Sequence, residues 1–183
     1  MRFIVFLICC WLGSAWADET LAICDGYGCL NAAEVVYSEA QLEKLRQYLF
    51  FAVDADTERF ILAGAIGLMY RWAGEQSVVR NDRGGNLADE YVVGRMDCID
   101  HSTSTTRLLR LLEDRRYLRW HRVRTPQARY FAGLIAVHWS AVIEESEAEG
   151  GEDFVVDSWF VDNGEPAVIL PLEDWKKGAG PDV

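Results

Sequence analysis

MDCIDHSTSTTRLL, residues 96–109, predicts a turn that leads into a helix beginning at Cys98. Asp97 is a favourable N-cap residue, because its side-chain oxygen can accept an N–H of the first turn that has no partner within the helix. Cys98 shares one helix face with Leu109 and Leu112, so this face should pack against a core. The helix dipole favours the thiolate form of a cysteine at this position, so we expect a lowered thiol pKa. A buried, inert cysteine is the alternative.

The first 17 residues have the parts of a secretory signal peptide. Arg2 provides the positive charge, residues 3–12 form an apolar run too short to span a bilayer, and an Ala-Trp-Ala cleavage signal ends at Ala17. We therefore expect a periplasmic or secreted protein without a stable membrane anchor. Its expected segments are a signal peptide over 1–17, a single domain over 18–175 and a flexible tail over 176–183.

Charge is unevenly distributed along the chain. The sequence has 29 acidic and 18 basic residues and a net charge of -11, which argues against nucleic acid and anionic membrane surfaces as partners. Eight arginines nevertheless lie between Arg107 and Arg129. They are expected to form a solvated surface, with a basic rim for an acidic substrate as the alternative. His121 lies in this basic stretch, and we expect it to be exposed.

The five cysteines divide into three groups. Cys9 and Cys10 would leave with the signal peptide, and Cys24 and Cys29 bracket a four-residue loop that a structural disulfide could close in an oxidising compartment. Cys98 is then unpaired, which is unusual in an exported protein. A disulfide from Cys98 to either of the other two is the alternative.

The residues between these cysteines predict a helical segment. Ser38 begins a capping box and an amphipathic helix, and a second, buried helix runs from about Asp56 to Trp72. Residues 81–86 form a loop by composition, just upstream of Cys98. Its amides could line a site, and we name Asn86 as a candidate substrate-binding residue.

Beyond Pro126 the apolar pattern changes to a period of two. This predicts central strands over 134–143 and 154–161, and an Asn-Gly turn into a third strand over 167–170. The expected fold is therefore α+β: an N-terminal helical half whose cysteine helix packs on a C-terminal antiparallel β-meander.

Each of the two central strands carries one polar residue that is unusual in a core, His138 on the first and Asp157 on the second. An antiparallel hairpin is symmetric about its loop, and the centre between these two residues falls in the acidic loop 146–149. The side chains should therefore lie directly opposite each other, roughly 4.5–5.5 Å apart at Cβ. Trp159 shares their face and is a candidate substrate-binding residue. A core histidine with a purely structural carboxylate partner is the alternative.

The order cysteine at a helix start, strand histidine, strand aspartate is that of nucleophile, base and orienting residue in covalent catalysis. It resembles the transglutaminase-like branch of the papain-like superfamily, over about residues 38–172. Within that branch, Asp97-Cys98-x-Asp100 is similar to the motif of bacterial transglutaminase-like cysteine proteinases, which are exported.

A second motif carries the same resemblance. Asp157-Ser158-Trp159 is similar to the Asn-Ser-Trp of papain relatives, in which the Trp shelters the hydrogen bond of the histidine. The resemblance implies an exported cysteine peptidase, amidase or acyltransferase that acts on a peptide, a protein or peptidoglycan. We expect no cofactor and no metal at this site. The implied catalytic residues are Cys98, His138 and Asp157.

Three alternatives remain at this point. An NlpC/P60-type peptidoglycan peptidase also has an Asp-Cys pair followed by a strand histidine. A catalytically silent envelope binding module of the same fold is favoured if Cys98 is disulfide-bonded or inaccessible. A metal site could form from Cys98 and His101, three residues apart, with His138 or Asp100 as further ligands.

Overall fold

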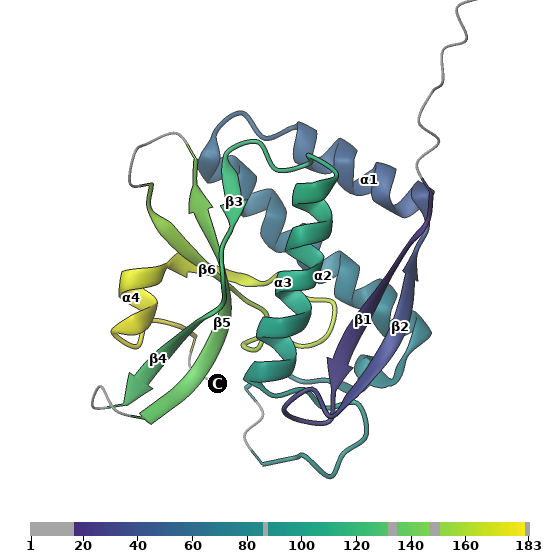
Figure 1. The fold of residues 1–183 in the computed structure, drawn as a ribbon, viewed down its shortest axis with the longest axis vertical. Helices are drawn as coiled ribbons and strands as arrows, with labels where there is room; N and C mark the ends of the chain where they lie inside the picture. The colour runs from purple at the N-terminus through teal and green to yellow at the C-terminus, as the bar shows by residue number, and fades with distance from the viewer. Residues whose placement is uncertain (1–16, 86–87, 132–134, 147–150, 182–183) are drawn as a thin grey trace, which may run out of the picture.

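The computed structural model describes residues 17–85, 88–131, 135–146 and 151–181. Helix α3 runs through the middle of the molecule, with a β-hairpin on one side and a five-stranded antiparallel sheet on the other (Figure 1). The expected signal peptide lies outside the described residues, except for Ala17. In chain order the elements are β1 (Glu19–Asp25), β2 (Asn31–Tyr37), α1 (Glu39–Phe50), α2 (Ala55–Gln76), η1 (Val78–Asn81), α3 (Cys98–Asp114), β3 (His121–Val123), β4 (Gln127–Phe131), β5 (Ile135–Glu145), β6 (Asp153–Asp157), β7 (Val168–Pro171) and α4 (Leu172–Lys176).

Helix α3 begins at Cys98, as the sequence predicts. The Asp97 side chain accepts the backbone N–H groups of Ile99 and Asp100, and the Asp100 side chain accepts the N–H of Asp97 in return. This reciprocal capping box satisfies N–H groups that have no partner within the helix. The buried face of α3 packs against β5 and β1, so the helix fixes Cys98 between the two sheets.

The N-terminal region contains a hairpin that the sequence pattern did not reveal. β1 pairs with β2 in an antiparallel register from Glu19 opposite Tyr37 to Asp25 opposite Asn31. Only Ile23 and Cys24 in β1, and Val35 and Tyr37 in β2, are fully buried among the apolar residues of these strands. The apolar stripe of each strand is therefore short, which explains why the pattern was missed.

Helix α2 is longer than predicted and is buried along much of its length, with Glu58 among its fully buried residues. Among the described residues, no helix combines the length and the apolar character needed to cross a bilayer, α2 included. Glu58 accepts a hydrogen bond from His121 at 2.8 Å, and both side chains are inaccessible to solvent. The expectation that His121 is exposed is therefore wrong, because this buried carboxylate provides its partner.

The C-terminal sheet has the order β3-β5-β6-β7, and β4 also pairs with β5. In the β5–β6 pair Ala141 lies opposite Val156 and Glu144 opposite Asp153. One further step would set Ser140, not His138, opposite Asp157, so the predicted register is wrong by two residues. Because side chains alternate with a period of two, an even shift keeps His138 and Asp157 on the same face.

The sheet separates two apolar clusters. The larger one contains the helices and one face of the sheet, with Ala141 and Ile143 from β5. The smaller one forms on the other face and contains Val142, Val155, Trp159, Phe160, Leu172 and Trp175. Helix α4 supplies two of these residues and ends at Lys176, after which the backbone N–H groups of residues 177–179 bond back to carbonyls of α4. His138 and Asp157 belong to the face that α4 covers.

Candidate active site

His138 and Asp157 form a buried pair. Nε2 of His138 lies 2.7 Å from Oδ2 of Asp157, and the two side chains are only 4% and 1% exposed. Two further N–H groups bind the same carboxylate: the indole of Trp175 donates to Oδ2 at 2.9 Å, and the backbone N–H of Trp159 donates to Oδ1 at 3.2 Å. The two side chains still meet although His138 and Asp157 are not directly opposite each other. Asp157 is the last residue of β6, and its side chain reaches diagonally toward β5.

Three aromatic rings surround the imidazole. The ring centroid of His138 lies 4.7 Å from that of Trp159, 5.5 Å from that of Phe160 and 5.6 Å from that of Trp175. A hydrogen bond that aromatic rings shield from water is electrostatically stronger than an exposed one. The sequence analysis placed Trp159 beside the pair but missed Trp175, whose short helix follows the last strand and carries little apolar periodicity.

Cys98 is the one free thiol among the described residues, and it is partly buried. It packs against the smaller apolar cluster, which contains Trp159 and Trp175. Burial raises the pKa of Cys98 above its usual value, and the charges of Asp97 and Asp157 add to this rise, whereas the Trp139 N–H opposes it. The expected lowering of the thiol pKa is therefore not found, because burial outweighs the helix terminus.

The hydrogen bond to Asp157 distinguishes the two ring nitrogens of His138. Because Asp157 engages Nε2, Nδ1 is the ring nitrogen that can accept a proton from outside the pair. Both β5 and β6 affect the pKa of Cys98, β5 through the Trp139 N–H and β6 through the charge of Asp157. Cys98, His138 and Asp157 are residue types that can serve as a nucleophile, a base and a residue that orients the base.

A disulfide-closed loop braces the start of α3. Cys24 and Cys29 form a disulfide, and the loop between them donates backbone N–H groups to the two capping carboxylates. The N–H of Gly28 bonds to Asp97, and those of Tyr27 and Cys29 bond to Asp100 at 2.9 and 2.6 Å. Burial raises the pKa of Asp100 to about 6. The loop thereby fixes the turn that presents Cys98.

The metal alternative fits these contacts poorly. Both ring nitrogens of His101 are engaged away from Cys98: Nδ1 lies 2.8 Å from the Ser158 hydroxyl, and Nε2 lies 3.0 Å from Asp82. Cys24, Cys29 and Asp100 lie close enough together to hold an ion, but the disulfide removes the two thiolates that such a site would need.

The loop upstream of α3 lies beside the candidate site. The N–H of Gly85 donates to the carbonyl of Trp159 at 2.9 Å, and Arg83 forms an ion pair with Asp162. This places the loop against the segment that follows Asp157. Asn86, the candidate substrate-binding residue of this loop, lies outside the described residues.

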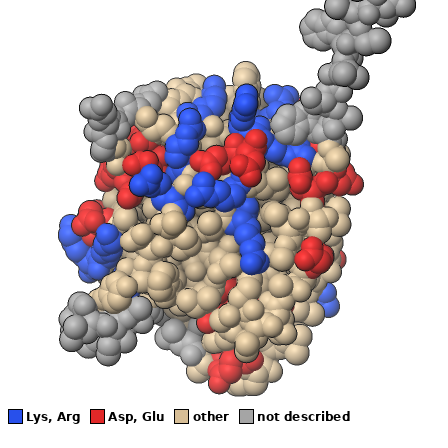
Figure 2. Space-filling model, in the orientation of Figure 1, with Lys and Arg blue, Asp and Glu red and all other residues tan. Residues whose placement is uncertain are grey.

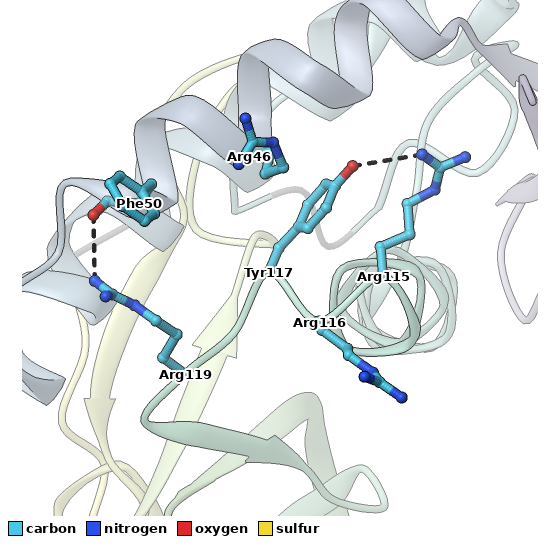
Figure 3. Close-up of a pocket in the computed structure, with 6 residues that line it drawn as sticks. All are labelled: Arg46, Phe50, Arg115, Arg116, Tyr117 and Arg119. Atoms are coloured by element: carbon cyan, nitrogen blue, oxygen red, sulfur yellow. Dashed lines mark hydrogen bonds between the residues drawn. The ribbon is translucent and has the colours of Figure 1, made fainter. Parts of the chain in front are cut away.

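The arginine-rich region lies at the other end of α3. Figure 2 shows most basic side chains on this face in its upper part, mixed with acidic ones. A pocket of about 120 Å³ lies there (Figure 3), lined by Arg46, Phe50, Arg115, Arg116, Tyr117 and Arg119. The 17 residues of α3 span about 25 Å, so this pocket is far from Cys98. The arginines that line this pocket therefore do not form a rim around the candidate active site, whereas Arg129 in β4 lies over the rings of Phe160 and Trp175 beside that site.

Local contacts also account for several of these arginines. Arg115 bonds to Glu19 and Glu39, and Arg119 donates to the backbone carbonyl of Phe50. Arg116 points away from Tyr117 in Figure 3. The guanidinium groups thus do not converge on one point of the pocket, which favours the expected solvated surface.

Comparisons of this chain with protein-family models, with curated proteins and with solved structures find no match.

Proposed function

We propose that this protein is an exported thiol hydrolase or acyltransferase of the transglutaminase-like, papain-like type, which cleaves or transfers a peptide or cell-envelope amide. The observation that carries the proposal is the buried His138–Asp157 pair, in which Asp157 engages Nε2, so that Nδ1 is the nitrogen that would take the thiol proton. A histidine held in this way, together with a partly buried free thiol at a helix start, supports the proposal of a Cys-His-Asp triad.

In this proposal the sulfur of Cys98 attacks the carbonyl carbon of the amide while His138 takes the thiol proton at Nδ1. The new C–S bond gives a tetrahedral intermediate, whose oxyanion can bind the backbone N–H of Cys98 at the start of α3. The C–N bond then breaks, His138 returns the proton to the leaving amine, and a thioester remains. Water, deprotonated by His138, releases a carboxylic acid and restores the thiol. A second amine in place of water gives transamidation.

The raised pKa of Cys98 sets the protonation state at rest. The thiol is protonated at neutral pH, so His138 acts as a general base during the attack and does not face a preformed thiolate. General-base assistance of this kind contributes roughly 10²–10⁴-fold to a rate. Asp157 supports it by fixing the ring and stabilising the imidazolium.

Alkylation of Cys98 by iodoacetamide at neutral pH tests the proposal without a known substrate. We expect His138→Ala to slow alkylation at least about tenfold and Asp157→Ala to slow it less. Cys98→Ser shows which label belongs to this site, and Thr106→Ala, on the outer part of the same helix, is the matched control. If Cys98 reacts like an ordinary thiol in all variants, the triad proposal is wrong.

A binding module without activity is the second candidate, and the raised thiol pKa is the observation that favours it. It predicts that His138→Ala leaves the alkylation rate unchanged while the fold stays intact. The same experiment therefore separates the two functions.

A further inference from the structure

A second buried histidine lies next to the candidate site, in a chain of hydrogen bonds. We name it the Ser158 chain. Its members are buried and come from α2, α3 and the two loops that flank the site: Tyr70, Asp82, His101, Thr105 and Ser158. The proposed mechanism uses none of them.

The contacts follow one another without a gap. The Tyr70 hydroxyl lies 2.9 Å from that of Thr105, and the Thr105 hydroxyl lies 2.9 Å from that of Ser158. Ser158 then lies 2.8 Å from Nδ1 of His101, whose Nε2 lies 3.0 Å from Asp82. The other oxygen of Asp82 accepts the backbone N–H of Met96, two residues before Cys98.

The hydroxyl groups of this chain can all donate in the same direction. If Nδ1 of His101 accepts from the Ser158 hydroxyl, the ring proton lies on Nε2, which faces Asp82. Ser158 then accepts from Thr105, and Thr105 accepts from Tyr70. Burial raises the pKa of Tyr70, so its hydroxyl keeps the proton that it donates. In this arrangement the hydrogen bonds run in one direction, from Tyr70 to Nδ1 of His101, whose Nε2 lies 3.0 Å from Asp82.

Ser158 stands between the two residues that hold His138. The preceding residue, Asp157, bonds to the imidazole, and the following residue, Trp159, lies against its ring. β6 ends at Asp157, so from Ser158 onward no strand partner fixes the backbone. The hydroxyl of Ser158 provides the hydrogen bonds from this three-residue segment to His101 and Thr105 of α3.

We infer that the Ser158 chain is a positioning device, which holds Asp157 and Trp159 against the proposed base and keeps them in register with the helix that carries the thiol. Apolar residues of similar volume would fill the same space without the desolvation of a histidine and a carboxylate, often at no loss of stability. What the polar chain adds is directionality, because each group accepts from one defined side. Its importance for catalysis rests on the proposed function, whereas its effect on the His138–Asp157 bond does not.

The test is nuclear magnetic resonance of the full chain, observing the downfield imidazole N–H proton that bonds to Asp157. His138→Ala identifies this resonance by its loss. We expect Ser158→Ala to broaden or weaken it and to slow alkylation of Cys98 about tenfold, because a small misplacement of a reacting group is costly. Ser158→Thr, which keeps the hydroxyl, should restore both the downfield resonance and the rate of Cys98 alkylation. Tyr70→Phe removes only the far end of the chain and should have a smaller effect in the same direction.

Thr106→Ala is the matched control. It also removes one hydroxyl hydrogen bond on α3, but Thr106 lies outside the Ser158 chain. If Ser158→Ala fails to fold, Tyr70→Phe carries the test. A downfield resonance that is unchanged in the folded Ser158→Ala or Tyr70→Phe protein overturns the inference. A resonance that responds, together with alkylation that ignores His138→Ala, supports the positioning device and overturns the proposed function.

Discussion

Trp175 and His138 bind the same oxygen of Asp157, the indole Nε1–H at 2.9 Å and the imidazole Nε2 at 2.7 Å. Trp175 is fully buried and belongs to α4, so a five-residue helix at the back of the sheet helps to fix the carboxylate that orients the proposed base. The site therefore depends on an element far from Cys98 in the sequence.

We expect Trp175→Phe to weaken the hold on Asp157 while keeping an aromatic ring in the smaller cluster. The lost hydrogen bond and the smaller ring should lower the free energy of unfolding by about 1–2 kcal/mol. Urea unfolding measures this change, and iodoacetamide alkylation of Cys98 should slow several-fold. Trp72→Phe reduces an aromatic ring of the larger cluster by the same amount and serves as the control. Equal alkylation rates in the two variants would show that Trp175 acts through packing alone.

The thiol of Cys98 should titrate above the ordinary cysteine value of about 8.5. Thiolate absorbance in the ultraviolet, followed against pH, measures this midpoint, and Cys98→Ser gives the baseline. Above pH 8.5 the unfolded chain loses this proton first, so the folded state binds more protons and stability falls as pH rises through that range. Asp97→Asn keeps an N-cap but removes a charge that raises the pKa, so it should lower the midpoint. A midpoint several units below 8.5 in the native protein would mean a preformed thiolate–imidazolium pair.

Opening the Cys24–Cys29 disulfide should loosen the loop that supplies N–H groups to Asp97 and Asp100. Closure of a loop this short stabilises the folded state by roughly 2 kcal/mol. Replacing both cysteines with serine in a Cys98→Ser background should lower the free energy of unfolding by about that amount, without thiol exchange as a complication. A reducing agent should then change the stability of Cys98→Ser but not that of the triple variant.

Glu58→Ala should destabilise the fold without affecting the site. It leaves buried His121 and the backbone N–H groups of Arg119 and Trp120 without their acceptor, at a cost of roughly 3–5 kcal/mol. Glu58 bonds residues 119–121, which follow the C-terminal end of α3, whereas Cys98 lies at the other end. The rate of Cys98 alkylation in the folded fraction should therefore stay unchanged. A large change in that rate would indicate that the two ends of α3 are coupled.

The sequence predicted those parts of the fold and candidate site that local chemistry determines. Asp97 caps α3 by its own side chain, and a histidine and an aspartate in apolar strands need a partner, so Cys98, His138 and Asp157 stood out. Long-range relationships were not accessible in this way. Trp175 reaches Asp157 only because α4 folds over the sheet, and His121 is buried only because Glu58 on a distant helix accepts its N–H.

The even displacement between β5 and β6 has a consequence for how this protein can change over time. Val142 and Val155 face the smaller cluster, and Ile143 and Phe154 face the larger one. We infer that this division of side chains sets the pairing of the two strands, and that the length of the connection between them does not. Insertions and deletions in that connection should therefore accumulate among descendants of this sequence, while the spacing within each strand stays constant. Homologues are then best recognised by the residues around His138 and Asp157, and the number of residues between them is a poor guide.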